Sequence, residues 1–176
     1  MKKVGLIILS VLLLFVIIFL IIYNKKDEKP FNSIELSENN QITNRTNITY
    51  YDTIVNVGLD AMNIHDVPVI IMELTDNARK QFDGTLKAHI RFHEGVYYLF
   101  IGKENRFDAI EIIAHEIIHI NQYNTNQLIY DGEIITWEDQ PFSLTDLEYN
   151  DRPWEKDAFD KQRNLTDKIN LLLYGF

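Results

Sequence analysis

The sequence predicts a mixed domain of helices and strands behind an N-terminal membrane-spanning helix. Three observations predict it: a long uncharged apolar run near the N-terminus, strand-like and helix-like periodicities that follow one another afterwards, and a hydrophobic content of 46% in 176 residues. This length accommodates one domain of ordinary size, and no internal repeat is visible. We therefore expect one anchor and one folded domain.

Residues 4–23 form an apolar run of 20 residues without a charged side chain. A run of this length can cross a bilayer as a helix. No small-residue cleavage site follows it, although a removable secretory signal would need one. The chain also lacks cysteine, which excludes a lipidated N-terminus, disulfides and thiolate metal sites. Residues 1–26 are predicted as an uncleaved single-pass anchor, with cleavage as the alternative.

The region that follows the anchor is polar and then acidic. Lysines on both sides of the anchor barely decide its orientation, but the short N-terminal stub favours a domain outside the cytoplasm. Residues 27–47 show no periodicity and are predicted as a polar tether to a domain at 48–176. From residue 30 onward, 12 Lys and Arg residues stand against 24 Asp and Glu residues. Such a domain repels phosphate backbones, so we expect no nucleic-acid partner.

Periodicity and turn residues predict the secondary structure of the domain. Amphipathic spacing predicts helices near 50–62 and 107–122, and a C-terminal helix that is capped by Asp151 and carries Pro153 in its first turn. A β-branched run predicts a strand at 67–74. Two hairpins are predicted, one from 86–93 and 96–102, and one around Asp131-Gly132.

The run AIEIIAHEIIHINQY, residues 109–123, places His115 and His119 four residues apart on the second predicted helix. This spacing stacks both imidazoles on one helix face, within reach of one zinc ion. Glu116 is offset from that face, as a general base acting on a water would be. The alternative is a chance string. Buried histidines without partners are costly, however, so the apolar context favours a metal site.

The other three histidines are predicted to be unrelated to this site. His89 and His93 share the four-residue spacing, but on a strand they are roughly 13 Å apart, too far for joint chelation. They are predicted on a solvated face. His65 lies in a turn-like segment without a visible partner.

A third ligand is expected from the C-terminal helix, because catalytic zinc usually takes three protein ligands and leaves one position open. Glu155 shares a side of that helix with apolar residues and faces inward, whereas Asp157 falls nearly opposite, among lysines. An inward carboxylate needs a charge partner, which zinc would supply. The alternative is a glutamate that only stabilises the positive end of the helix.

The segment HEIIHINQ is followed by PWEKDA, in which Glu155 lies 36 residues after His119, and the pair resembles the gluzincin type of zinc metallopeptidase. More narrowly, it is similar to small bacterial and phage proteins that pair this helix with a hairpin ending in Trp and an RPWE-x-x-A motif. The resemblance covers about residues 105–165. It implies a zincin-like α+β fold, in which a small antiparallel or mixed sheet packs on the metal-binding helix and the C-terminal helix. It also implies His115, His119 and Glu155 as zinc ligands and Glu116 as catalytic base.

The resemblance further implies hydrolysis of a peptide or protein substrate held along an edge strand, for which 96–101 is the expected segment. Tyr149, Tyr123 and Tyr130 are the local candidates for stabilising the oxyanion. Many gluzincins carry an Asp after the Ala of the motif to brace a ligand histidine. Phe159 stands there in this chain, and Asn121, Gln122 or Asp157 are the possible substitutes.

Three alternatives remain open at the level of sequence. The chain could be a membrane-tethered binding or structural module with a structural or inactive metal site. It could also be a hydrolase acting on something other than peptides, because the same atoms would serve. Finally, the acidic segment 124–151 either rims a cleft that prefers basic substrates or forms a solvated face.

Overall fold

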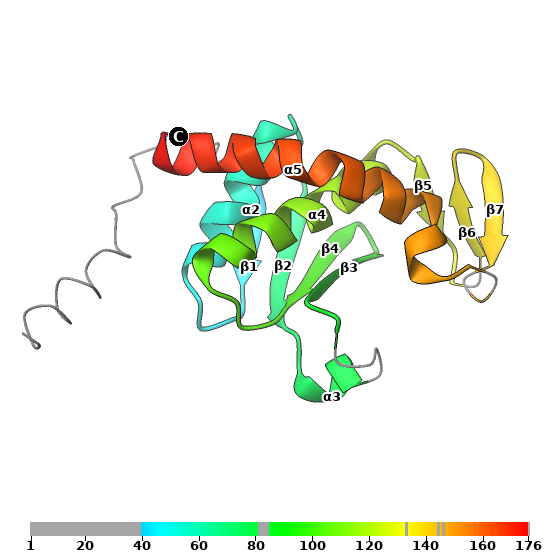
Figure 1. Cartoon of the computed structure of the whole chain (residues 1–176), viewed down its shortest axis with the longest axis horizontal. Helices are drawn as coiled ribbons and strands as arrows, with labels where there is room; N and C mark the ends of the chain where they lie inside the picture. The colour runs from blue at the N-terminus through cyan, green and yellow to red at the C-terminus, as the bar shows by residue number, and fades with distance from the viewer. Residues whose placement is uncertain (1–39, 81–84, 133, 144, 146, 176) are drawn as a thin grey trace, which may run out of the picture. The chain divides into compact units, whose positions relative to one another are not determined.

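The computed structural model describes residues 40–80, 85–132, 134–143, 145 and 147–175. These residues belong to one compact unit with two sheets and four α-helices (Figure 1). The predicted α+β class is therefore confirmed. The predicted anchor lies outside the described residues, as does the predicted tether up to residue 39. None of the helices in the described part is long and apolar enough to span a bilayer.

The larger sheet has four strands in the order β1-β2-β4-β3. Strands β1 (Gln41–Asn44), β2 (Pro68–Glu73) and β4 (Val96–Ile101) are parallel, and β3 (Ala88–His93) pairs antiparallel with β4. The predicted strand and hairpin are confirmed. Glu94 and Gly95 form the two-residue turn, and both have positive φ angles, as a primed turn requires.

Strand β1 is absent from the sequence-based prediction. It lies within the range predicted as tether, so the folded domain begins before Ile48. Two of its four residues are exposed and two are half-buried, and the strand shows no apolar alternation of its own. They become a strand because they pair with the edge of β2, from Gln41 opposite Pro68 to Asn44 opposite Ile71.

Two predicted helices cover one face of this sheet. Helix α2 (Tyr50–Ala61) packs next to β1, and α4 (Arg106–Asn124) packs next to β3 and against α2 (Figure 1). The Asn105 side chain caps α4 by accepting hydrogen bonds from two backbone N–H groups, each at 3.1 Å. Alternate strand residues are buried beneath the helices: Val69, Ile71, Tyr97, Leu99 and Ile101.

Helix α5 (Pro153–Tyr174) crosses over both α2 and α4 and forms a third layer (Figure 1). The three helices approach closely at Gly58. A Cβ atom at this position would overlap the Cδ1 atom of Ile117 on α4 and lie 3.1 Å from Cδ1 of Ile169 on α5. A glycine on α2 thus lets the other two helices pack tightly, which fixes α4 and α5 relative to each other.

The start of α5 differs from the prediction. Pro153 occupies the first turn as expected, but the N-cap is Arg152, without a side-chain cap bond. Asp151 instead ends a short 3₁₀ helix (Tyr149–Asp151), and its carboxylate pairs with Lys156 at 3.1 Å. The predicted Asp151 cap is therefore wrong, because the 3₁₀ turn delays the start of the helix.

The segment that connects the end of α4 to the start of α5 forms a second sheet. It contains β5 (Leu128–Tyr130), β6 (Ile134–Trp137) and β7 (Gln140–Ser143), all antiparallel. The predicted hairpin at Asp131-Gly132 is confirmed, with Gly132 at a φ of 106°. Strand β7 and the short helix α3 (Asp76–Lys80) were not predicted. The core of this sheet packs on the start of α5, through Leu128, Ile135, Trp137 and Trp154.

Candidate metal centre

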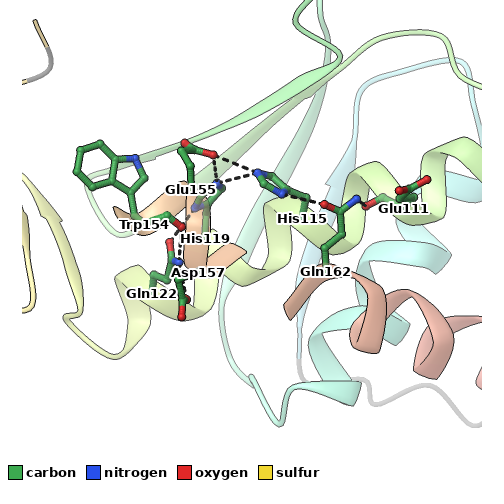
Figure 2. A network of polar contacts seen from close by, with 8 residues as sticks. All are labelled: Glu111, His115, His119, Gln122, Trp154, Glu155, Asp157 and Gln162. Carbon is green, nitrogen blue, oxygen red and sulfur yellow. Dashed lines mark hydrogen bonds and ion pairs between the residues drawn. The ribbon is translucent and has the colours of Figure 1, made fainter. Parts of the chain in front are cut away.

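His115, His119 and Glu155 converge from two helices that are far apart in sequence. The two histidines are one turn apart on α4, and Glu155 lies in the first turn of α5, where Trp154 anchors the chain in the small sheet (Figure 2). All three residues are at least 93% buried, with exposed fractions of 6% or 7%. The inward orientation predicted for Glu155 is confirmed.

The three facing atoms form a nearly equilateral triangle. His115 Nε2 lies 3.2 Å from Glu155 Oε2, His119 Nε2 lies 3.4 Å from the same oxygen, and the two Nε2 atoms are 3.2 Å apart. Ligands held about 2.0 to 2.1 Å from a tetrahedral ion are separated by about 3.3 Å. The spacing thus matches that of three ligands on one ion, and this buried group could hold a metal ion.

Gln122 fixes the protonation of His119. Its amide nitrogen donates to the Trp154 carbonyl at 3.0 Å and to the Asp157 carboxylate at 2.9 Å, so its amide oxygen faces the histidine. That oxygen lies 2.7 Å from His119 Nδ1. Because an amide oxygen only accepts, His119 must carry its proton on Nδ1.

Gln162 performs the same role for His115 from α5. Its amide nitrogen donates to the Glu111 carbonyl at 3.3 Å, and its oxygen accepts from His115 Nδ1 at 3.2 Å (Figure 2). Gln162 was not among the predicted braces. Its spacing, seven residues after Glu155 and hence on the same face of α5, is the sequence signal that could have found it.

The hydrogen bonds from Gln122 and Gln162 determine whether the two Nε2 atoms act as donors or acceptors. With both Nδ1 atoms protonated, neutral imidazoles present bare lone pairs at both Nε2 atoms. The Glu155 carboxylate presents a third lone pair to the same point. Three acceptors at 3.2 to 3.4 Å repel one another in a buried place unless positive charge, either a proton or a cation, lies among them.

The pKa shifts of the group reflect this demand for positive charge. Burial acts to raise the pKa of Glu155, but hydrogen bonds from His115 and His119 outweigh it and the pKa is lowered. Burial acts to lower the pKa of His119, but the hydrogen bond to Glu155 and the nearby Glu116 charge raise it to about 9. A dication bound here must therefore take the place of a proton.

Glu116 follows His115 in the sequence but is not one of the three candidate metal ligands. It is 5% exposed, and its carboxylate accepts a hydrogen bond from the backbone N–H of Ile90 on β3. Burial raises the pKa of Glu116, although the two histidines oppose this effect. A carboxyl group with a raised pKa next to a metal site suits proton transfer near neutral pH.

The strand next to the site is β3 rather than the predicted segment 96–101. That segment is β4, which lies between β2 and β3 and has no free edge. The prediction was wrong because the order of strands in a sheet is not encoded locally. Strand β3 is an edge strand, and Lys87, just before it, bonds to Gly102 on the β4 side. Alternation then directs the backbone groups of Ala88, Ile90 and Phe92 to the free edge.

The three candidate tyrosines differ in their environment. The Tyr149 hydroxyl donates a hydrogen bond to Glu155, and burial followed by the Glu155 charge raises its pKa. Tyr123 packs its ring against Phe92 and Tyr97, and burial raises its pKa to about 12. The Tyr130 hydroxyl bonds to the Gly132 carbonyl within its own hairpin. Only Tyr149 has a hydrogen bond to a residue of the triangle.

Phe159 lies next to the triangle, whereas the remaining histidines lie elsewhere in the domain. The Phe159 ring packs against the ring of His115, with 4.6 Å between centroids. His93 is exposed, as predicted, but His89 stacks on Phe100 and burial lowers its pKa. The solvated position predicted for His89 is therefore wrong. His65 lies 3.7 Å from Asp60.

Comparison with protein-family models, with curated proteins and with solved structures found no match to this chain.

The two glutamine braces give a first prediction. We expect Gln122→Leu and Gln162→Leu each to weaken zinc binding by about 10- to 100-fold, because residues that orient ligand histidines typically contribute this much. Competition with a chromophoric chelator measures the affinity. Gln140→Leu, on the exposed strand β7, is the matched control and should bind zinc like the parent chain. Unchanged affinity in both brace variants would remove the glutamines from the site.

Proposed function

We propose that this chain is a membrane-anchored zinc peptidase of the gluzincin type, with a zincin-like fold, that hydrolyses peptide bonds. The observation that carries this proposal is the triangle of three buried lone pairs, with a carboxyl group of raised pKa beside it. A structural zinc site usually closes all four positions with protein ligands, whereas a catalytic site supplies three. Among the described residues, the group contains three such ligands.

Zinc is the ion that this donor set suits best. Two imidazole nitrogens and one carboxylate oxygen form a typical catalytic zinc set, whereas calcium and magnesium prefer oxygen ligands alone. His115, His119 and Glu155 would hold the ion. When bound, zinc supplies a Lewis acid that polarises the substrate carbonyl and makes a water molecule more acidic.

The protein residues would divide the remaining work. Glu116 accepts the proton of the attacking water and later donates it to the leaving amine. Its hydrogen bond to Ile90 ties this base to the edge strand that would hold the substrate. A peptide added along the free edge of β3 would thereby lie beside the base. The Tyr149 hydroxyl, which lies next to Glu155, would donate to the oxyanion that develops on the carbonyl.

The roles of Glu116 and Glu155 can be separated by metal analysis. We expect Glu116→Gln to keep about one zinc per chain and to lose hydrolysis of a mixed peptide library, because the base but no ligand is removed. Glu155→Ala should lose the zinc itself. Glu73→Gln, a partly exposed carboxylate at the end of β2, should change neither property. Retained hydrolysis in Glu116→Gln would reject the proposed base and leave a metal-binding module.

The proposed role of Tyr149 in stabilising the oxyanion can be tested with Tyr130, a candidate tyrosine on β5, as the comparison. We expect Tyr149→Phe to lower kcat by about 10- to 1000-fold with zinc content unchanged, because one oxyanion donor is lost. Tyr130→Phe is the matched control, since its hydroxyl bonds only within its hairpin. The kcat and zinc content of both variants are measured side by side. Equal kcat values for the two variants would exclude Tyr149 from the reaction.

The membrane anchor is proposed from the uncharged apolar run at residues 4–23. We expect the full chain to stay in the membrane fraction after washing with carbonate at high pH, because a spanning helix resists this treatment. Protease added outside the cell should degrade the domain if it faces outward, as the short N-terminal stub favours. Recovery of the full chain in the soluble fraction would contradict the anchor.

A further inference from the structure

Among the described helices, α2 and α4 cover one face of the four-stranded sheet and leave the other face partly exposed. Side chains alternate between the two faces along each strand. In β4 the buried residues alternate strictly with partly exposed ones, and β2 shows the same alternation up to Met72. We call the less buried side of the sheet the open face. Its apolar residues are Pro68, Ile70, Met72, Val96, Tyr98 and Phe100.

The register of the strands joins these apolar residues into one patch. Ile70 on β2 lies opposite Tyr98 on β4, and Phe100 follows two residues later on the same face. On the outer strand β3, His89 stacks on Phe100 with 4.7 Å between the ring centroids, and Arg91 lies opposite Tyr98. A continuous apolar patch with a polar rim is typical of a surface that contacts a partner or a membrane.

The formal charges on the open face are positive. Arg45 directly follows β1, where its backbone N–H still donates to the Ile71 carbonyl at 2.9 Å. Lys87 directly precedes β3, where its carbonyl accepts from the Gly102 N–H at 3.0 Å. Alternation therefore directs both side chains to the open face, as it does for Arg91, and all three cations are exposed. Among the strand residues on this face, none is an Asp or Glu.

This distribution of charge favours an anionic occupant of the open face. From residue 30 onward, 24 Asp and Glu residues stand against 12 Lys and Arg residues, so a face with cations alone is unlike the rest of the chain. A second copy docked face to face would bring like charges together. An anionic lipid surface instead combines opposite charge with an apolar layer, which suits aromatic side chains flanked by cations. Acidic groups more than about 8 to 10 Å from the lipids are largely screened by salt.

The length of chain that precedes β1 keeps this face near the proposed anchor. Residues 24–40 connect the apolar run at 4–23 to Gln41, the first residue of β1. A connection of this length spans at most about 60 Å. The attachment point lies on the sheet itself, because the side chain of Gln41 alternates with that of Ile42 and points to the open face. Such tethering gives the lipid surface a high effective concentration, so weak contacts are sufficient for docking.

We propose that the open face docks on the surface of an anionic membrane. Tyr98 and Phe100 enter the headgroup layer, where amphipathic aromatic rings are favoured. The cations around them contact lipid phosphates. This inference rests on the proposed membrane anchor but not on the proposed zinc chemistry. Because α4 packs on the other face of the sheet, docking leaves the candidate metal centre on the side away from the lipids.

A fluorophore on a single introduced cysteine tests the docking, because the chain has no cysteine of its own. Thr43→Cys labels an exposed position of the open face, and Asn164→Cys labels an exposed position of α5 as the matched control. Each labelled full chain is reconstituted into vesicles that contain a lipid-attached quencher. We expect several-fold stronger quenching at residue 43 than at residue 164 in vesicles rich in phosphatidylglycerol, and no difference in pure phosphatidylcholine. Gln41→Cys, exposed on the same strand, repeats the measurement if Thr43→Cys does not fold.

Charge variants separate lipid docking from other ways of covering this face. We expect Arg45→Gln and Arg91→Gln each to lower the ratio of docked to undocked chain about fivefold, because one cation near an anionic surface contributes this much. Arg163→Gln, which removes an exposed arginine from α5, should leave the ratio unchanged. Shielding of residue 43 from a water-soluble quencher in both vesicle types, without an effect of Arg91→Gln, would assign the face to a protein segment and overturn lipid docking.

Flotation of the same vesicles separates failure of the docking from failure of the anchor. A full chain that floats with the vesicles but shows equal lipid quenching at residues 43 and 164 in phosphatidylglycerol overturns the docking and leaves the anchor in place. A full chain that floats with neither vesicle type overturns both. The zinc content and peptide hydrolysis of the chain are unaffected by either result.

Discussion

The convergence of three lone pairs in a buried place is the constraint on which the rest of this structure depends. Two glutamine amides keep protons on the outer nitrogens of His115 and His119, so both inner nitrogens face the Glu155 carboxylate as acceptors. Bringing these groups together out of water is unfavourable unless positive charge joins them. The packing of α4 against α5 therefore offsets the free-energy cost of holding these three groups together in a place that could hold a metal ion. The surrounding fold can be understood as the means of holding that site together.

Each layer of the fold contributes one part of this preparation. The four-stranded sheet supports α4 and places the free edge of β3 beside Glu116, and Gly58 allows α5 to approach α4 closely. The small sheet fixes the other end of the site, because its core contains Trp154, the residue before the third ligand. The Trp154 carbonyl also accepts from Gln122, so the backbone that positions Glu155 is joined to the brace of His119. The two ligand-bearing helices are therefore coupled by a direct hydrogen bond as well as by packing.

The sequence predicted the parts of this site that are encoded locally. The histidine pair and Glu116 follow from helical spacing within five residues, and the orientation of Glu155 follows from its apolar neighbours on α5. Of the two braces, Gln122 lies three residues after His119 and was among the predicted candidates, whereas Gln162 meets His115 across 47 positions and was not predicted. Strand β1 was missed for a related reason, since its strand conformation comes from pairing with β2 rather than from its own alternation. The edge strand was misassigned because neither member of a hairpin reveals which one has a further neighbour.

The use of neutral amides to brace both histidines has an electrostatic consequence for the proposed reaction. An Asp hydrogen-bonded to a ligand histidine would add negative charge near the ion and reduce the positive potential that acts on the substrate carbonyl. Gln122 and Gln162 orient the same nitrogens without adding charge.

Asp157 does carry charge, but it reaches His119 only through Gln122, and Lys161 pairs with it at 2.7 Å. Glu155 is then the one carboxylate of the triangle, so a dication there keeps a net positive charge. That charge would lower the pKa of the nearby Glu116, offsetting the effect of its burial and keeping the base ionised near neutral pH.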